Sequence, residues 1–227
     1  MFAACLVKRL SLYRRVLGAL ASPEGWAGGL GSSDGEYVFS HDLASLAGVS
    51  AAQVRRDVMT IGYTGSPRRG YDVAGLIGRI GEFLDAPGGQ SAVLVGLGHL
   101  GKAVLAYVGG RRTGLRIVAG FDVDPAKCGR VIHGCRCHGM EALAEVIAEH
   151  GANVGLVAVP GAEAQNVSIQ LVRAGVRGLL NFAPVRLQVP EYVFVEDVDI
   201  TVSLESVAFF ARHDAVRRQA MIKEAVR

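Results

Sequence analysis

The sequence lacks long hydrophobic runs: among its 227 residues, no apolar stretch approaches the ~18 residues that a membrane-spanning helix needs. It also lacks a strong charge imbalance, because a formal net charge of +3 favours no class of partner. The first residues, MFAACLVKRL, place Lys8 and Arg9 after the apolar stretch, whereas a signal peptide has its basic residues first. We therefore expect a cytoplasmic protein whose four cysteines are reduced thiols.

Core material is ample, because 50% of the residues are hydrophobic and 20% are charged, as is typical of globular proteins. The segments before residue 86 are mainly helical in pattern. From Ser91 onward, strand-like apolar runs alternate with helical stretches, which is typical of βαβ units in a parallel sheet. The pattern predicts an α/β protein with a small helical domain at 1–86, a Rossmann-like doubly wound domain at 87–202 and a C-terminal dimerisation helix at 203–227.

Two short helices joined by a turn containing Gly48 are predicted between residues 40 and 61, which is a helix-turn-helix arrangement. In the second helix Val54, Val58 and Ile61 are expected to face inward, and Gln53, Arg56, Asp57 and Thr60 outward. The basic segment GYTGSPRRGYDV that follows is interpreted as a wing beside the helix. The candidate DNA contacts are Ser50, Gln53, Arg55, Arg56, Asp57, Arg68 and Arg69. An ordinary three-helix bundle with solvated arginines is the alternative.

The stretch SAVLVGLGHLGKAV has the pattern of a strand that turns tightly into a helix around a pyrophosphate. Gly96 permits the turn, Gly98 lets the backbone approach the phosphates, and Gly101 lets the helix pack closely on the strand. Asp122 follows the next strand and can accept hydrogen bonds from the adenosine ribose, which favours NAD(H) over NADP(H). A glycine-rich turn in an empty α/β domain is the alternative.

Catalytic machinery is sparse beside this motif. There is no Tyr-x-x-x-Lys pair, and neither His99 nor His213 is obviously poised beside a carboxylate. Only about thirty residues follow the last predicted strand, and we expect them to form a helix with no room for a substrate domain. The nucleotide is therefore expected to be read as a signal. An NAD-dependent oxidoreductase and a regulator that answers a CoA ester are the competing hypotheses.

Taken together, several segments resemble the Rex family of redox-sensing transcriptional repressors. The resemblance covers nearly the whole chain and rests on RLSLYRRVL, GVSAAQVRRDVMTIGYTG, VGLGHLGKAVLAY, AGFDVDPAKCG, VAVPGAEAQ, RAGVRGLLNFAPVRLQVP and VEDVDITVSLESVAFF. It implies a homodimer with a winged-helix domain, a Rossmann NAD(H)-binding domain and a C-terminal helix exchanged between subunits. It also implies binding to an inverted-repeat operator DNA, with release when NADH binds.

Carried over residue by residue, the resemblance gives each site a set of positions. It implies that Gly96, Leu97, Gly98, His99, Leu100 and Gly101 bind phosphate and that Asp122 binds ribose. It implies that the nicotinamide side is lined by Val159, Pro160 and the segment 181–184, with Asn181, Ala183 and Pro184. It implies a redox-sensing linkage among Arg15, Tyr107 and Asp199.

Three segments depart from that pattern or stand outside it. The wing reads GSPRRGY where the family usually has a sequence like GKRGVGY, and the loop Ser22 to Gly35 is longer than usual. Cys128, Cys135 and Cys137 lie near His133 and His138, but Cys-x-Cys is not the usual zinc spacing. We expect structural cysteines there, with a bound metal or a redox disulfide as the alternative.

Overall fold

The computed structural model describes residues 4–21, 37–109 and 114–225, with side chains described as far as 212. The chain divides into two compact units, residues 1–88 and 89–227, which are described separately. The predicted loop from Ser22 to Gly35 and the side chain of His213 lie outside the described residues.

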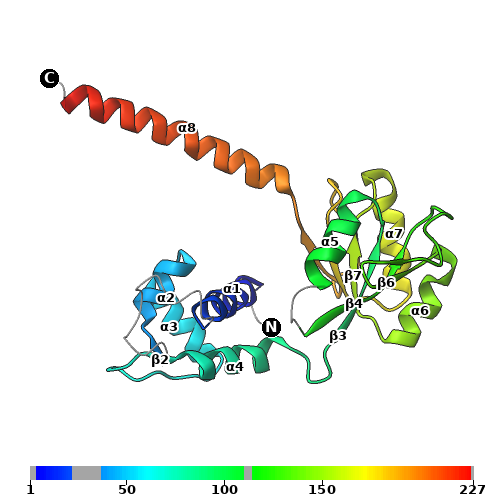
Figure 1. Cartoon of the computed structure of the whole chain (residues 1–227), viewed down its shortest axis with the longest axis horizontal. Helices are drawn as coiled ribbons and strands as arrows, with labels where there is room; N and C mark the ends of the chain where they lie inside the picture. Colours follow the sequence, from blue (N-terminus) through cyan, green and yellow to red (C-terminus); the bar gives the residue numbers. More distant parts are fainter. Residues whose placement is uncertain (1–3, 22–36, 110–113, 226–227) are drawn as a thin grey trace. The chain divides into compact units, whose positions relative to one another are not determined.

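The first unit is a small helical fold with a two-stranded sheet (Figure 1). Its core is formed by one face of each helix, including Leu10, Tyr13, Val54, Val58 and Leu76. These residues recur at helical spacing within each segment, so their side chains converge once the helices pack. In chain order the elements are α1 (Ala4–Leu20), β1 (Tyr37–Val38), α2 (Ser40–Ala47), α3 (Ala51–Thr60), β2 (Tyr71–Asp72) and α4 (Val73–Leu84).

The helix-turn-helix and the wing both form in this unit. The hydroxyl of Ser50 caps α3 by accepting a hydrogen bond from the backbone N–H of Gln53 at 3.2 Å. Strand β1 pairs antiparallel with β2. Between α3 and β2, Ser66 and Gly70 exchange two backbone hydrogen bonds of 2.7 Å, which closes a short loop with Arg68 and Arg69 exposed at its tip.

The second unit is a seven-stranded sheet in the order β5-β6-β4-β3-β7-β8-β9. All neighbouring strands are parallel except β5 and β6. The strands are β3 (Gln90–Val95), β4 (Leu115–Phe121), β5 (Val131–Ile132), β6 (Cys135–His138), β7 (Val154–Val157), β8 (Gly178–Asn181) and β9 (Phe194–Asp197). Strand order reverses at β3, and in such sheets ligands bind beyond the carboxyl ends of the strands at this switch point. The predicted α/β fold class is confirmed.

Helices cover both faces of this sheet (Figure 1). Alternate residues of β3 point to opposite faces: Val93 and Val95 pack with helices α6 and α7, whereas Ala92 and Leu94 pack with α5. The helices are α5 (His99–Gly109), the short 3₁₀ helix η2 (Met140–Ala142), α6 (Leu143–His150), α7 (Gly161–Arg173) and α8 (Ile200–Ala225).

Helix α8 differs from the others because its described side chains, residues 200–212, are all exposed. They include large apolar residues such as Leu204, Val207 and Phe210, which are 65%, 66% and 65% exposed. In the part of the chain that the structure describes, no helix is both long and apolar enough to cross a membrane.

Candidate functional site

The glycine loop between β3 and α5 is shaped by three glycines in three different ways. Gly96 has a φ of 96°, and a Cβ there would lie 2.4 Å from the carbonyl oxygen of Ala158. A Cβ on Gly101 would lie 1.9 Å from the carbonyl oxygen of Gly96. A Cβ on Gly98 would meet nothing within 4 Å. The fold itself therefore requires glycine at 96 and 101, whereas no contact within the protein requires glycine at 98.

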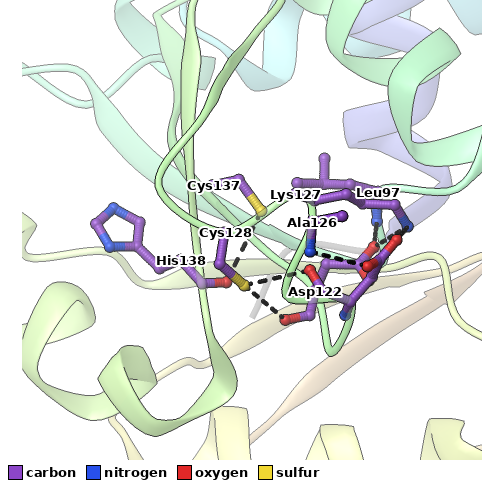
Figure 2. Close-up of polar contacts among 8 residues, drawn as sticks. Leu97, Asp122, Ala126, Lys127, Cys128, Cys137 and His138 are labelled. Atoms are coloured by element: carbon purple, nitrogen blue, oxygen red, sulfur yellow. Dashed lines mark hydrogen bonds and ion pairs between the residues drawn. The ribbon is translucent and has the colours of Figure 1, made fainter.

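Asp122 lies at the end of β4 and is held by groups from this loop and from its own turn (Figure 2). Its Oδ2 accepts hydrogen bonds from the backbone N–H of Leu97 and from Nζ of Lys127, both at 2.8 Å, and Oδ1 accepts from the backbone N–H of Asp124 at 2.9 Å. Burial alone would raise the pKa of the Asp122 carboxyl, but these hydrogen bonds and the charge of Lys127 lower it. Asp122 is therefore an anchored carboxylate that is only 7% exposed.

A pocket of about 580 Å³ opens beside this carboxylate. Gly96, Gly98, Asp122, Val159 and Pro160 are among its lining residues. A carboxylate, glycine backbone and apolar side chains around a cleft of this size suit a nucleoside joined to phosphates. Leu97 does not line this pocket, unlike Gly96 and Gly98. Its side chain is fully buried, and its backbone N–H donates to Asp122.

A second pocket of about 480 Å³ lies beyond the start of α5 and the ends of β8 and β9. Leu100, Ala183, Pro184 and Asp199 are among its lining residues. The segment 159–160 was expected to line the nicotinamide side together with 183–184, but the structure places the two segments in different pockets.

Asn181 was also expected to line the nicotinamide side, and the structure does not support this placement. The residue is 1% exposed and is absent from the lining of both pockets. Its Nδ2 donates to the carbonyl of Val185 and to Oδ1 of Asp197, both at 2.8 Å, and its Oδ1 accepts from the N–H of Ala183 at 3.0 Å. Asn181 therefore shapes the loop that carries Ala183, because its polar atoms are used within the protein.

Two residues of the expected redox linkage lie on helices, and the third lies just before a helix. Arg15 is exposed on α1 of the first unit, and Tyr107 is 59% exposed on α5 of the second. Asp199 precedes α8, where its Oδ1 accepts from the N–H groups of Thr201 and Val202 at 2.8 and 3.3 Å. These contacts make Asp199 the N-terminal cap of α8, and the residue also lines the second pocket.

The predicted DNA-reading surface lies entirely in the first unit. Arg55 and Arg56 are exposed on α3, and Gln53 is partly exposed beside them. Nη1 of Arg55 donates to the hydroxyl of Ser40 at 3.1 Å, so this arginine is braced against α2. Arg69 at the wing tip lies 5.8 Å from the ring centroid of Tyr37, a cation–π distance.

The prediction that Asp57 faces outward is wrong. Asp57 is 3% exposed, and Arg9 on α1 donates to both of its oxygens, from Nε to Oδ2 at 2.6 Å and from Nη2 to Oδ1 at 2.8 Å. The hydroxyl of Tyr13 donates to Oδ2 at 2.9 Å, and Nε2 of Gln53 donates to Oδ1 at 2.7 Å. This carboxylate therefore joins α1 to α3 and is not available to DNA.

Arg9 and Lys127 are the two partners that sequence reasoning missed. For Arg9 a signal existed, because Asp57 occupies the third position after Val54 and so belongs to the inward face of α3. A charge on a buried helix face needs a countercharge, and Arg9 and Tyr13 stand four residues apart on α1. Lys127 lies five residues beyond Asp122. The two side chains meet because of the shape of the turn between them, which the sequence pattern did not reveal.

The cysteine-rich segment provides no metal site. Cys128, Cys135 and Cys137 are free thiols, and burial is the main cause that raises the pKa of both Cys135 and Cys137 to about 11. The S–H of Cys128 donates to the carbonyl of Asp124 at 3.4 Å (Figure 2 shows the cluster). Across the described ranges, no group of three or more His, Cys, Asp or Glu side chains could hold a metal ion.

Comparison with known proteins relates both units to one family. Residues 89–185 match the family model of the CoA binding domain. The chain is 40% identical over 208 residues to a redox-sensing transcriptional repressor Rex from Carboxydothermus hydrogenoformans, which covers 92% of this chain and 95% of that protein. Crystal structures of RSP, a Rex-family repressor, in complex with β-NADH and with β-NAD⁺ and operator DNA each have a TM-score of 0.80 and 26% identity. They cover 96% of this chain and 98% and 96% of RSP. The chain therefore belongs to the Rex family of redox-sensing transcriptional repressors.

Proposed function

We propose that this protein is a repressor that binds an inverted-repeat operator and releases it when NADH replaces NAD⁺. The observation that carries the proposal is the pocket formed by Gly96, Gly98 and Asp122 in a chain that also carries a helix-turn-helix. The relatives are named transcriptional repressors, so the oxidoreductase alternative is set aside. We also propose that the protein is cytoplasmic, because it is proposed to act on operator DNA.

The residues of the first pocket fit the adenosine and pyrophosphate of NAD(H). Because Gly98 has no side chain, phosphates can come close to its backbone. The helix dipole at the N-terminus of α5 favours their negative charge. Asp122 holds three hydrogen bonds and retains acceptor capacity for a ribose hydroxyl. A ribose phosphate would be repelled by this carboxylate, which disfavours NADPH, and the same argument disfavours the 3′-phosphorylated ribose of CoA despite the name of the matching family model.

DNA binding is assigned to α3 and the wing of two subunits. Ser50, Gln53, Arg55 and Arg56 of α3 would enter a major groove, while Arg68 and Arg69 would contact the backbone or the minor groove. The exposed apolar residues of α8, including Val207 and Phe210, support a homodimer in which this helix is covered by the second subunit.

Discrimination between the two forms of the nucleotide is assigned to the second pocket, because Asp199 supplies a negative charge there. When bound, the cofactor supplies a nicotinamide ring that is cationic only when oxidised. Asp199 would attract the cationic ring, and with the reduced ring it would be free to take part in the linkage with Tyr107 and Arg15 that the family resemblance implies. To shift the protein from 1:99 to 99:1 between two states, NADH must bind the favoured state about 10⁴-fold more tightly than the other state. This difference corresponds to about 5.5 kcal/mol, which two sites per dimer would share.

The test is fluorescence anisotropy of a labelled operator titrated with NADH, NAD⁺ and NADPH. NADH is expected to release the DNA at concentrations where the other two do not. The matched variant is Asp199→Asn, since asparagine keeps the helix cap of α8 but removes the charge. This variant is expected to bind NADH and to respond weakly. Equal release by NADH and NAD⁺, or full responsiveness of Asp199→Asn, would contradict the assignment.

A further inference from the structure

The contact between Gln53 and Asp57 fixes which end of the Gln53 amide faces outward. Nε2 of Gln53 donates to Oδ1 of Asp57, one helical turn further along α3. An ionised carboxylate only accepts hydrogen bonds, so the amide must offer it the NH₂ group and not the carbonyl oxygen. The two hydrogen bonds from Arg9 hold the carboxylate in its charged form and in place.

The carbonyl oxygen of Gln53 therefore faces outward, and one of the two Nε2–H donors is committed to Asp57. Oε1 of Gln53 accepts from Nη2 of Arg56 at 3.1 Å in an exposed contact, and a carbonyl oxygen can accept a second hydrogen bond. In the major groove, adenine and cytosine present exocyclic amino groups that suit such an acceptor. Guanine and thymine present keto oxygens at the corresponding edge, which would face Oε1 with no hydrogen between them.

We propose that Asp57 is a positioning residue that makes Gln53 select, at one position of each operator half-site, a base with an amino group over a base with a keto oxygen. The inference rests on the proposed function, because α3 must enter the major groove for Gln53 to meet a base. It assigns Gln53 a specificity role that its residue type alone does not define, since a free amide presents its donor as readily as its acceptor.

The experiment determines base preference at every position of the half-site. Duplexes randomised in both half-sites are bound to the full-length protein with NAD⁺, recovered and sequenced. The wild type is expected to favour amino over keto bases by about tenfold at one position. Gln53→Ala should lose this preference and keep those at other positions. Asp57→Asn should weaken or reverse it, because the asparagine amide allows Gln53 to turn its NH₂ outward.

Tyr13→Phe is the matched control for a purely structural effect. It removes a hydrogen bond to Oδ2 of the same carboxylate and leaves the contact between Oδ1 and Gln53 in place. It should therefore preserve the base preference even if binding weakens on all duplexes. An unchanged preference in Gln53→Ala overturns the inference, as does a Tyr13→Phe profile altered like that of Asp57→Asn. An unchanged preference in folded Asp57→Asn also overturns the inference; if that variant does not fold, an unchanged preference in Gln53→Ala still overturns it. A wild type that recovers no duplex above background overturns the proposed function itself, which distinguishes the two failures.

Discussion

Among the described residues, each unit has one buried aspartate with a lowered pKa, and the two carboxylates are held in different ways. Asp57 is bound by side chains, two of which come from α1, 44 and 48 residues away in sequence. Asp122 is bound mainly by backbone N–H groups and by a lysine five residues away. Asp57 thus holds two helices together, whereas Asp122 is positioned by its own strand end and faces a pocket.

This difference shows that burial and a lowered pKa do not by themselves identify a ligand-binding carboxylate. In both cases burial opposes ionisation and hydrogen bonds overcome it. What separates them is whether acceptor capacity remains and whether it faces a pocket. Four hydrogen bonds from protein groups occupy Asp57, while Asp122 accepts three. A carboxylate offers about four acceptor sites, so only Asp122 retains one for a ligand.

The largest effect is expected for Asp57→Ala. The change leaves the Arg9 guanidinium and the buried Tyr13 hydroxyl without their acceptor. We expect a loss of about 3 kcal/mol in the free energy of unfolding, the lower end for breaking a buried ion pair, since the Arg9 side chain keeps 24% exposure. Urea unfolding with hydrogen exchange of α1 and α3 peptides measures it. Glu82→Ala is the control, because it removes an exposed ion pair with Arg79 and should cost at most about 0.5 kcal/mol.

Asp122→Ala should affect ligand binding more than folding. Loss of a hydrogen bond between a carboxylate and a ribose hydroxyl should weaken NADH binding by about 2 kcal/mol, or roughly thirtyfold. The change also leaves Nζ of Lys127 in the pocket without the carboxylate to which it donates. The affinity for NADPH should therefore rise relative to the affinity for NADH. Calorimetry with both nucleotides tests this. The gain should disappear when Lys127→Met is added, and a wild type that binds both nucleotides equally would refute the ribose assignment.

Tyr13→Phe should have a smaller effect that depends on pH. Burial, followed by the hydrogen bond to Asp57, raises the pKa of the Tyr13 hydroxyl. Its contribution to stability is therefore complete below the unfolded pKa of about 10 and is lost as the pH rises towards the higher folded pKa. At pH 7 the free energy of unfolding of the variant should be about 1 kcal/mol lower than that of the wild type. Above pH 10 it should fall less steeply with pH than that of the wild type. Tyr63 and Tyr71 titrate in both proteins, so the difference between the two curves isolates Tyr13.

The smallest effect on folding is expected for Gly98→Ala. Its Cβ would enter open space, so stability should change by no more than about 0.5 kcal/mol. Nucleotide affinity should nevertheless fall, because the methyl group occupies the space that the phosphates would approach. Thermal unfolding with and without NADH separates the two quantities. Unchanged affinity for NADH would show that the phosphates lie elsewhere.

The sequence predicts the second unit well because its signals are local. Strands β3, β4, β7 and β8 each contain a run of apolar residues, and the glycine motif lies in a single turn. Strand β9 (Phe194–Asp197) carries a weaker sequence signal, because two of its four residues are acidic.

Tertiary contacts account for the errors at the sites. Asp57 was placed outward on its polarity, and its partners Arg9 and Tyr13 belong to another helix. Asn181 was placed at a ligand, although its amide is used by its own loop and by Asp197 on the neighbouring strand. Both residues have polar side chains that hydrogen-bond within the protein. Sequence spacing alone does not distinguish such residues from polar residues that contact a ligand.

In the proposed function the nucleotide site is divided between two pockets, and only one of them meets the part of NAD(H) that changes. The adenosine half is identical in both forms, so contacts around Asp122 strengthen both equally and discriminate between neither. When both forms are present well above their dissociation constants they compete for a filled site, so occupancy follows their ratio and not the total amount of nucleotide. Changes at Asp122 should alter how much total nucleotide is needed for saturation. Changes at Asp199 should alter the ratio at which the genes are switched.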